Sequence, residues 1–496
     1  MKKLFILTTL FFLLFYSQKI IAQELRKLTF DEVIKLSEEQ SPQALMAKHR
    51  FRASYWQFRS YQAQFRPSLT LRGTAPNYTN GFSKEYNSTT GQYDYVPINI
   101  INSTSTLSLS QAIGLTSTTI SLQSGINHLY DFEQTSTQPR QYNVSPFSIN
   151  LTQPIRQYNT LKWQRKIEPV KYDAAKKTYL ANIESVHMSA VQNFFSLALA
   201  QINKQIAEMN FSNSDTLYRI ARGRYDLGTI SEDELLQMEL SYLNAQTARK
   251  EADMNLRDRE IRLRSFLGFN ENVRLELIIP SDIPSLQVDV KEVLDLAMAN
   301  NPDLMTQQIN VLNAQSSVAQ ARASMGLNAS LTASLGLSQT GSDFMTAVRN
   351  PNQTQTVAVG FTVPILDWGR GRGNFKMAQS SLELAQVQAK QTLVDFQQNL
   401  FLDVEQFNLQ KNQVAIAAKS DTVAMKRFEV TKQRFLIGKI AILDLNDADT
   451  RKDQNRRAYI QSLQNYWNYF FNLRSLTLFD FINRKPLGTE YEKLLQ

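Results

Sequence analysis

Hydrophobic and polar side chains alternate residue by residue in several segments of this chain of 496 residues. Over residues 327–337, Leu and Ala alternate with Asn, Ser, Thr and Gly without a break. A period of two is typical of a β-strand with one apolar and one polar face. The same alternation recurs over residues 106–110, 148–152 and 357–363. We therefore expect strands at about 67–155 and again at about 327–366.

Long segments without glycine or proline follow both strand regions. Neither residue type occurs over residues 170–222 or 374–437. Apolar residues in the second segment are spaced three and four apart, which is typical of a helix packed along a coiled-coil-like seam. Shorter helices are expected to begin at Pro42 and Pro302, because proline is favoured at the first helical position. Each half of the chain is thus predicted to contain a helix, strands, a long helix and a return helix.

One turn sequence occurs twice in the chain. Residues 224–235 (RYDLGTISEDEL) correspond to residues 434–445 (RFLIGKIAILDL), with Gly228 matching Gly438. Glycine directly after a helix adopts the left-handed conformation of a C-cap without strain. Each copy is therefore interpreted as the turn between a long helix and its return helix. In the first copy, Ser231 with a glutamate three residues later has the spacing of a capping box for the return helix.

These features divide the chain into two similar halves. The expected organisation is a signal peptide at 1–22, a first structural repeat at 23–269 with its tip at 224–232, an equatorial linker at 270–292, a second structural repeat at 293–480 with its tip at 434–442, and a C-terminal tail at 481–496. The first repeat holds additional residues in its strand region. Residues 105–125 predict an added β-hairpin there, which would give the first repeat four strands and the second repeat two.

The N-terminus has the pattern of a secretory signal peptide. Lys2 and Lys3 precede an apolar core over residues 4–16, and a cleavage position follows Ala22. The core is shorter than the run of about 20 apolar residues that a membrane-spanning helix needs. We therefore expect an exported protein rather than one anchored by this segment.

The composition excludes several kinds of chemistry. The chain has no cysteine and three histidines, which are not spaced as metal ligands, so we expect neither a metal site nor a cofactor. The formal charge of +9 is spread over the periodic segments, which indicates solvated helix faces rather than a nucleic-acid surface. Residues 369–373 (GRGRG) lack the spacing of a phosphate-binding loop. No catalytic set of residues is evident, and we expect no enzyme activity.

The alternating strands favour a membrane protein. A membrane barrel requires strands of about 9–11 residues with this alternation, but a soluble sheet covered on one face shows it too. No segment is available as a second apolar layer, and the polar stretches 78–99 and 341–355 are typical of long outward loops. We therefore predict a β-barrel portion. An exported coiled-coil structural protein without channel activity is the alternative.

The paired tips with the pattern R-[YF]-x-x-G, the segment 363–375 (VPILDWGRGRGNF) and the layout in two halves resemble TolC-like outer-membrane efflux proteins. The resemblance covers nearly the whole chain after the signal peptide. It implies a mainly α fold in which a trimeric α-helical barrel of long coiled-coil helices continues into an outer-membrane β-barrel. It also implies the exit duct of a tripartite efflux or type I secretion system.

The same resemblance implies partners and a location. The implied partners are two further copies of the chain in a homotrimer, a periplasmic membrane-fusion (adaptor) protein, an inner-membrane transporter and outer-membrane lipid. The implied location is the outer membrane, with an extension into the periplasm. The nature of the cargo, whether drugs, metal ions or polypeptides, stays open.

The resemblance further implies roles for residues at the tips. The adaptor-docking residues would be Arg224, Tyr225, Gly228, Arg434 and Gly438. The residues of the periplasmic aperture would be Asp444, Asp447, Phe435, Lys439 and Glu234. Asp444 and Asp447 would lie in a narrow ring, where like charges raise each other's pKa; the alternative is the solvated acidic start of an ordinary helix. Phe435 and Ile440 stand where the family's best-described member has the tyrosine and arginine that hold its entrance shut.

Overall fold

The computed structural model describes residues 25–132, 139–269, 273–280, 282–437, 439–440 and 442–495. The predicted signal peptide and Gly438 lie outside these residues. The chain divides into two compact units. Unit 1 comprises Met1–Phe51, Lys177–Asn301 and Phe396–Gln496, and unit 2 comprises Arg52–Lys176 and Pro302–Asp395.

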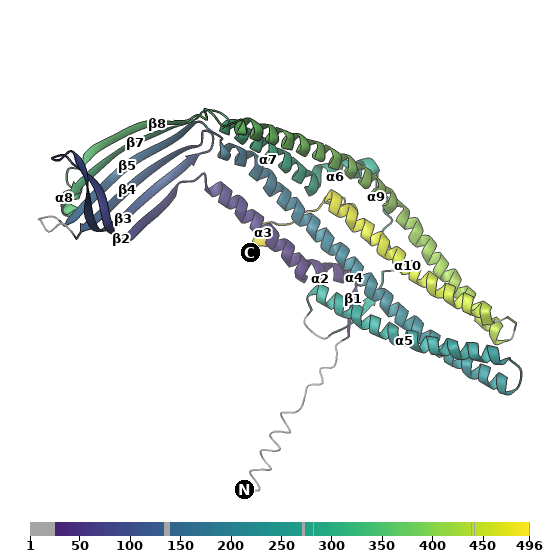
Figure 1. Ribbon diagram of the computed structural model, residues 1–496. Helices are drawn as coiled ribbons and strands as arrows, with labels where there is room; N and C mark the ends of the chain where they lie inside the picture. The colour runs from purple at the N-terminus through teal and green to yellow at the C-terminus, as the bar shows by residue number, and fades with distance from the viewer. Residues whose placement is uncertain are drawn as a thin grey trace, which may run out of the picture. The chain divides into compact units, whose positions relative to one another are not determined.

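Helices dominate the chain, and strands are concentrated in two segments (Figure 1). In chain order the elements are β1 (Leu25–Thr29), α2 (Phe30–Gln40), α3 (Pro42–Ala63), β2 (Ser68–Asn87), β3 (Gln92–Ile113), β4 (Thr118–Asp131), β5 (Arg140–Arg156), α4 (Thr160–Asp226), α5 (Glu232–Leu267), β6 (Arg274–Ile278), α6 (Val290–Asn300), α7 (Pro302–Ser324), β7 (Asn328–Gly341), α8 (Phe344–Val348), β8 (Asn352–Thr362), α9 (Arg370–Leu436), α10 (Ile442–Thr477), β9 (Phe479–Asp480), β10 (Lys485–Pro486) and the 3-10 helix η1 (Lys493–Leu495). The order helix, strands, long helix and return helix occurs in each half, as predicted.

The two long helices have equal lengths, and so do the two return helices. Helices α4 and α9 each have 67 residues, and α5 and α10 each have 36 residues. At 1.5 Å per residue, a long helix extends about 100 Å and a return helix about 54 Å. Over the described residues, none of the helices combines the length and the apolar character that a membrane-spanning helix needs.

Unit 2 contains a six-stranded antiparallel sheet in the order β2-β3-β4-β5-β7-β8 (Figure 1). Residues 100–113 of β3 pair with residues 118–131 of β4 around a turn at residues 114–117, so the hairpin predicted over residues 105–125 is present. Strands β5 and β7, from different halves of the chain, pair directly, with Asn150 opposite Ser334. The single sheet therefore joins the two halves.

The prediction of a loop over residues 78–99 was wrong. Strands β2 and β3 continue as a paired hairpin as far as Asn87 and Gln92. Side chains across this hairpin hold it together, since the rings of Tyr86 and Tyr93 lie 5.3 Å apart and Lys84 Nζ lies 4.6 Å from the centre of the Tyr93 ring. Cross-strand aromatic and cation–π contacts of this kind stabilise strands that carry few aliphatic residues.

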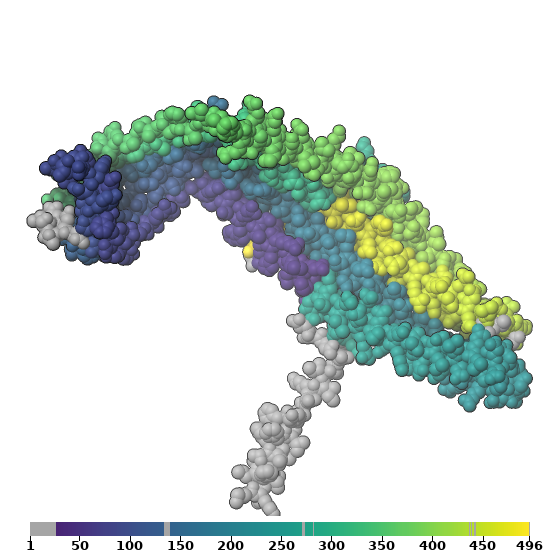
Figure 2. All heavy atoms as spheres, viewed as in Figure 1, coloured from purple at the N-terminus to yellow at the C-terminus, as the bar shows by residue number. Residues whose placement is uncertain are grey.

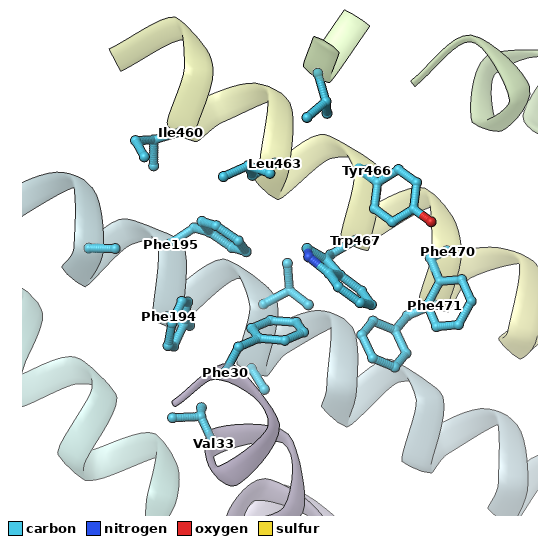
Figure 3. Close-up of a cluster of buried hydrophobic side chains, with 14 of the residues drawn as sticks. Phe30, Val33, Phe194, Phe195, Ile460, Leu463, Tyr466, Trp467, Phe470 and Phe471 are labelled. Atoms are coloured by element: carbon cyan, nitrogen blue, oxygen red, sulfur yellow. The ribbon is translucent and has the colours of Figure 1, made fainter. Parts of the chain in front are cut away.

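Aromatic side chains from three distant segments form the core of unit 1 (Figure 3). The ring of Phe30 in α2 lies 5.3 Å from that of Phe194 in α4 and 4.7 Å from that of Trp467 in α10. Phe194, Phe195 and Tyr466 are completely buried. Because aromatic side chains bury more apolar surface than any others, this cluster is the main source of stability where the helices of unit 1 meet.

The predicted linker between the halves is bonded to three helices of unit 1. Strand β6 pairs in parallel with β1, and the Gln201 side chain in α4 bonds the backbone of β6 at 2.7 Å and 3.3 Å. The backbone of Val288 exchanges two hydrogen bonds of 3.1 Å with the Asn408 side chain in α9. The hydroxyl of Tyr466 in α10 donates to the carbonyl of Pro284 at 2.8 Å. Burial raises the pKa of Tyr466 to about 12, so this hydroxyl keeps its proton.

A chain of charged side chains, largely buried except for Glu38, lies beside the aromatic cluster. His187 in α4 is buried, with Nδ1 3.3 Å from Glu184 Oε2 and Nε2 3.6 Å from Glu38 Oε2 in α2. Arg474 in α10 donates to both oxygens of Glu184, at 3.0 Å and 2.9 Å. Burial alone lowers the pKa of His187, but the carboxylates of Glu184 and Glu38 outweigh burial, and the net direction is upward. When protonated, His187 forms ion pairs that link α2 to α4 and, through Glu184, to α10.

We expect His187→Gln to destabilise the protein more at about pH 5.5 than at about pH 8.5. A pKa raised in the folded state means that protonated His187 contributes stability below its unfolded pKa, and that this contribution is lost as the pH rises through the folded pKa. The additional loss at low pH should be about 1–3 kcal/mol, the range for one partner of a buried polar pair. Denaturant unfolding of the full chain at the two pH values measures it. His49→Gln, at an exposed position, is the control. Equal losses at both pH values would contradict the prediction.

Candidate functional site

The two faces of the unit 2 sheet carry different kinds of side chain. The strand register places an apolar row of directly opposed residues across five strands: Leu69, Leu109, Leu122, Ile149 and Leu335. It places a polar row across all six strands: Ser68, Ser110, Ser121, Asn150, Ser334 and Thr356. Neighbouring residues of a strand point to opposite faces, so the two rows lie on opposite faces of the sheet.

The apolar face is not covered by other described parts of the chain. The five residues of the apolar row are 39–65% exposed. On β8, Val357, Val359 and Phe361 extend this face and are 60–74% exposed. An apolar patch that continues across a whole sheet marks contact with a membrane or with another protein.

The first tip has the geometry of a glycine C-cap. Gly228 has a φ of 70°. The backbone N–H of Thr229 donates to the carbonyl of Arg224 at 2.9 Å, and the N–H of Gly228 donates to that of Tyr225 at 2.8 Å. These two bonds close the end of α4 and require a residue that tolerates the left-handed conformation. Arg224 and Tyr225 therefore lie exposed on the last turn of α4.

The predicted capping box at the start of α5 is confirmed. The Glu234 N–H donates to Ser231 Oγ at 3.3 Å, and the Ser231 N–H donates to Glu234 Oε2 at 3.0 Å. Glu234, which the family resemblance assigned to the aperture, thus uses its carboxylate to end the tip turn.

The second tip repeats one of these backbone bonds. The N–H of Lys439 donates to the carbonyl of Arg434 at 3.0 Å, with the same spacing as the bond from Thr229 to Arg224. The side chains of Arg434 and Lys439 are exposed. Asp444 is also exposed, in the first turn of α10, where an acidic side chain is favoured by the helix dipole.

The side chain of Phe435 is partly buried against neighbouring apolar side chains near the second tip. It lies against a small apolar cluster of Phe428, Leu445 and Ala448, together with Leu217 of α4. The side chain therefore holds the α9–α10 hairpin against α4. The sequence pattern of α9 alone could not predict this contact, because the contact depends on which residues of α4 lie opposite Phe435.

The expected rise in the pKa of Asp447 depends on a ring of several copies, and within one chain the neighbours of Asp447 act in the opposite direction. Asp447 Oδ2 lies 2.8 Å from Arg427 Nη2 in α9, and Asp447 Oδ1 lies 2.9 Å from Arg451 Nε one turn further along α10. The Arg427 guanidinium, with that of Arg451, lowers the pKa of Asp447. Arg451 could have been found from its spacing of four residues, but Arg427 required the register between the two helices.

A cleft of about 340 Å³ lies between the α4–α5 and α9–α10 hairpins of unit 1, which run side by side in Figure 2. Beside it, the buried Lys452 Nζ lies 2.6 Å from Asp449 Oδ1 and 3.3 Å from Asp453 Oδ1. Burial raises the pKa of Asp449. Lys452 Nζ also lies 4.1 Å from the centre of the Phe428 ring. The sequence did not indicate that Lys452 is buried with Asp449 and Asp453, since these charges are spaced like those on a solvated helix face.

Solved structures with a similar fold include outer-membrane proteins. The outer membrane channel CmeC of Campylobacter jejuni is 16% identical, with a TM-score of 0.65 over 94% of this chain and 88% of that chain. The outer membrane protein VceC of Vibrio cholerae is 14% identical, with a TM-score of 0.62 over 92% of this chain and 97% of that chain. At these identities the likeness shows the fold.

The sequence itself shows the family. Residues 33–269 and 293–477 match the family described as outer membrane efflux protein, and these segments make up most of the chain. The chain therefore belongs to the outer membrane efflux protein family, a family of channel proteins rather than enzymes, and it is a protein of the outer membrane. An uncharacterized protein of Haemophilus influenzae is 24% identical over 247 residues, which cover 47% of this chain and 51% of that protein. The chain thus spans about half the length of the curated relative it matches.

We expect Gly228→Ala to weaken the first tip without unfolding unit 1. A residue with a Cβ at this left-handed position costs about 1–2 kcal/mol, although no neighbouring atom would clash with it. Amide hydrogen exchange around residues 224–231 should accelerate by about 5–30-fold, since that cost favours local opening. Gly223→Ala, inside α4, is the control and should stabilise the helix by about 0.5–1 kcal/mol. Equal exchange in wild type and Gly228→Ala would show that the turn does not depend on the glycine.

Proposed function

We propose that the chain is one of three identical subunits of an outer-membrane exit duct. In this proposal the sheets of three copies close into one β-barrel, and the long helices form an α-helical barrel that extends into the periplasm. The two halves of each chain are tandem structural repeats that contribute side by side to both barrels. Six strands from each copy would make a barrel of about 18 strands, which is within the range of outer-membrane barrels.

The observation that carries the proposal is the pair of rows across the sheet. In a barrel, the apolar row that contains Leu109 and Leu122 faces lipid, and the polar row that contains Ser110 and Ser121 lines a water-filled lumen. The alternative, an exported coiled-coil structural protein, leaves the apolar row exposed to water. Membership of an efflux family supports the channel over this alternative.

The hairpin tips are proposed as the point where cargo enters. An inner-membrane transporter and a periplasmic membrane-fusion protein would form a tripartite efflux or type I secretion system with the duct, and the adaptor would dock on the tips. The exposed side chains of Arg224, Tyr225 and Arg434 support this docking role. Gly228 would contribute indirectly, because its left-handed turn ends α4 directly after Arg224 and Tyr225. Gly438, which the family resemblance places at the second tip, lies outside the described residues.

The periplasmic aperture is proposed at the start of α10. Asp444 is exposed there, five residues after the exposed Lys439 of the tip, and it would present a carboxylate to passing ions. Asp447 would instead hold the α9–α10 hairpin closed, because it is bound by Arg427 and Arg451. Phe435 and Glu234 would shape the aperture through packing and helix capping.

The first test places a charge on each face of the sheet in turn. We expect Leu109→Lys to prevent stable insertion into lipid bilayers, because a lysine at the lipid face of a barrel costs about 2–4 kcal/mol. Ser110→Lys, the matched control one residue away, should insert normally and change the conductance in planar bilayers. Light scattering of the wild type in detergent should give the mass of a trimer. A detergent-free monomer, or equal effects of the two lysines, would contradict the proposed duct.

The second test separates the two carboxylates of the proposed aperture. Asp444→Asn removes one carboxylate from each of the three copies, and we expect it to weaken the cation preference of the channel by about five-fold or more, since one unit charge at close range is worth about 1 kcal/mol. Asp447→Asn should change this preference less, because its charge is already paired with two arginines. Reversal potentials in a KCl gradient measure both. If Asp444→Asn leaves the reversal potential unchanged, Asp444 lies off the pore and is an ordinary solvated helix start.

A further inference from the structure

At the end of the unit 2 sheet where β8 leads into α9, large apolar side chains are exposed on the surface. Strand β8 ends at Thr362 and α9 begins at Arg370. In the loop between them, Ile365 is 95% exposed and Trp368 is 89% exposed. The turn between β3 and β4 lies at the same end and exposes Leu115.

The β8–α9 loop is held in a defined conformation. Asp367 Oδ1 accepts a hydrogen bond from the Gly369 N–H at 2.9 Å, and Asp367 Oδ2 accepts one from the Gly371 N–H at 2.8 Å. Trp368 has a φ of 55°, a conformation that bulky residues rarely adopt. The loop thus holds an exposed indole ring at a backbone position that is strained for a bulky residue.

Basic side chains surround these apolar residues. We call the following seven exposed residues the basic edge: Arg156, Lys162, Arg165, Lys166, Arg370, Arg372 and Lys376. They belong to the end of β5 and the first turns of α4 and α9. Over residues 156–166 and 363–376 the only carboxylate is that of Asp367, whose oxygens already accept two backbone hydrogen bonds. Strands β5 and β8 are separated by β7 alone, so the two segments leave the sheet about 10 Å apart.

We propose that the basic edge binds anionic phospholipid headgroups of the periplasmic leaflet, and that Trp368 and Ile365 enter the interface of that leaflet. The inference rests on the proposed function, in which the apolar face of the sheet lies in the outer membrane. The apolar residues Val357, Val359 and Phe361 of β8 run directly into this loop. Tryptophan is enriched where a membrane meets water. Guanidinium groups bind phosphate oxygens in pairs of hydrogen bonds, and clustered lysines and arginines attract anionic lipid.

In the proposed barrel a second copy pairs with β8 through its own β2, but that copy brings further positive charge to the basic edge. Strand β2 is the edge strand on the other side of the sheet from β8. It begins shortly after Arg66 and contains Arg72. Contact between two basic surfaces is repulsive, whereas phosphate groups supply the missing negative charge. The charge of the edge therefore favours lipid as its occupant.

The charge is tested with the full-length protein in nanodiscs. The bilayers contain phosphatidylcholine with or without about a quarter of phosphatidylglycerol. Native mass spectrometry of the protein released from them counts the phosphatidylglycerol molecules it retains. Arg370→Gln with Arg372→Gln should weaken the preference for phosphatidylglycerol by about 25-fold, since each basic residue near an anionic surface contributes about five-fold. Lys419→Gln with Lys426→Gln removes the same charge from exposed positions further along α9 and should leave the preference unchanged.

The position of Trp368 is tested by fluorescence quenching. Phospholipid brominated near the top of its acyl chains quenches tryptophan only at short range, so wild type should be quenched more than Trp368→Phe. Trp467→Phe is the control, because Trp467 lies in the core of unit 1 and should not contribute to quenching. Quenching that is equal in wild type and Trp368→Phe would place the ring away from lipid, against a neighbouring copy or in water, and would overturn the proposal.

The outcomes separate this inference from the proposed function. A wild-type trimer that conducts ions but retains no more phosphatidylglycerol than the Arg370 and Arg372 double variant would overturn the lipid site and leave the duct standing. Loss of preference in the Lys419 and Lys426 variant as well would show general charge attraction and would also overturn a specific edge. Failure of the wild type to enter nanodiscs would overturn both proposals.

Discussion

Water on one face of the sheet and an apolar medium on the other is the condition that the rest of this structure has to satisfy. The row from Leu69 to Leu335 leaves five aliphatic side chains uncovered, and each buried side chain of this size is worth about 1.5–3 kcal/mol relative to water. The serine-rich row on the other face gains nothing from an apolar medium. A boundary between two media suits both rows, and this is the arrangement that the proposed barrel would provide.

The helices of unit 1 are organised differently because their largest apolar cluster lies away from the tips. Phe30, Phe194 and Trp467 form an aromatic cluster there, next to the buried charges around His187. Towards the tips the apolar contacts become sparse, and the cluster of Phe428, Leu445 and Ala448 is small. Regions with few buried contacts open at lower free energy than a core does. The tips are therefore the part of unit 1 that can change conformation while the rest stays folded.

Much of the fold could be predicted because it depends on local signals. A period of two marked the strands, Pro42 and Pro302 marked helix starts, and Ser231 marked a helix cap. The length of the β2–β3 hairpin was missed because its glycines, asparagines and prolines are typical of loops. At the candidate site, the turn at Gly228 was local and predictable. The pairing of Asp447 with Arg427 was not, because it depends on how α9 and α10 align, and a shift of one residue would separate the two side chains.

The pairing of β5 with β7 has a consequence for the order in which the chain is made. Strands β2 to β5 can form from neighbouring segments as soon as the first half emerges, but β5 then remains an open edge until β7 has been synthesised. Unpaired edges are templates on which strands of other molecules add. The half-made sheet, with an open edge and an apolar face, is therefore the stage most exposed to aggregation, and export has to deliver the second half quickly or keep the first half from its neighbours.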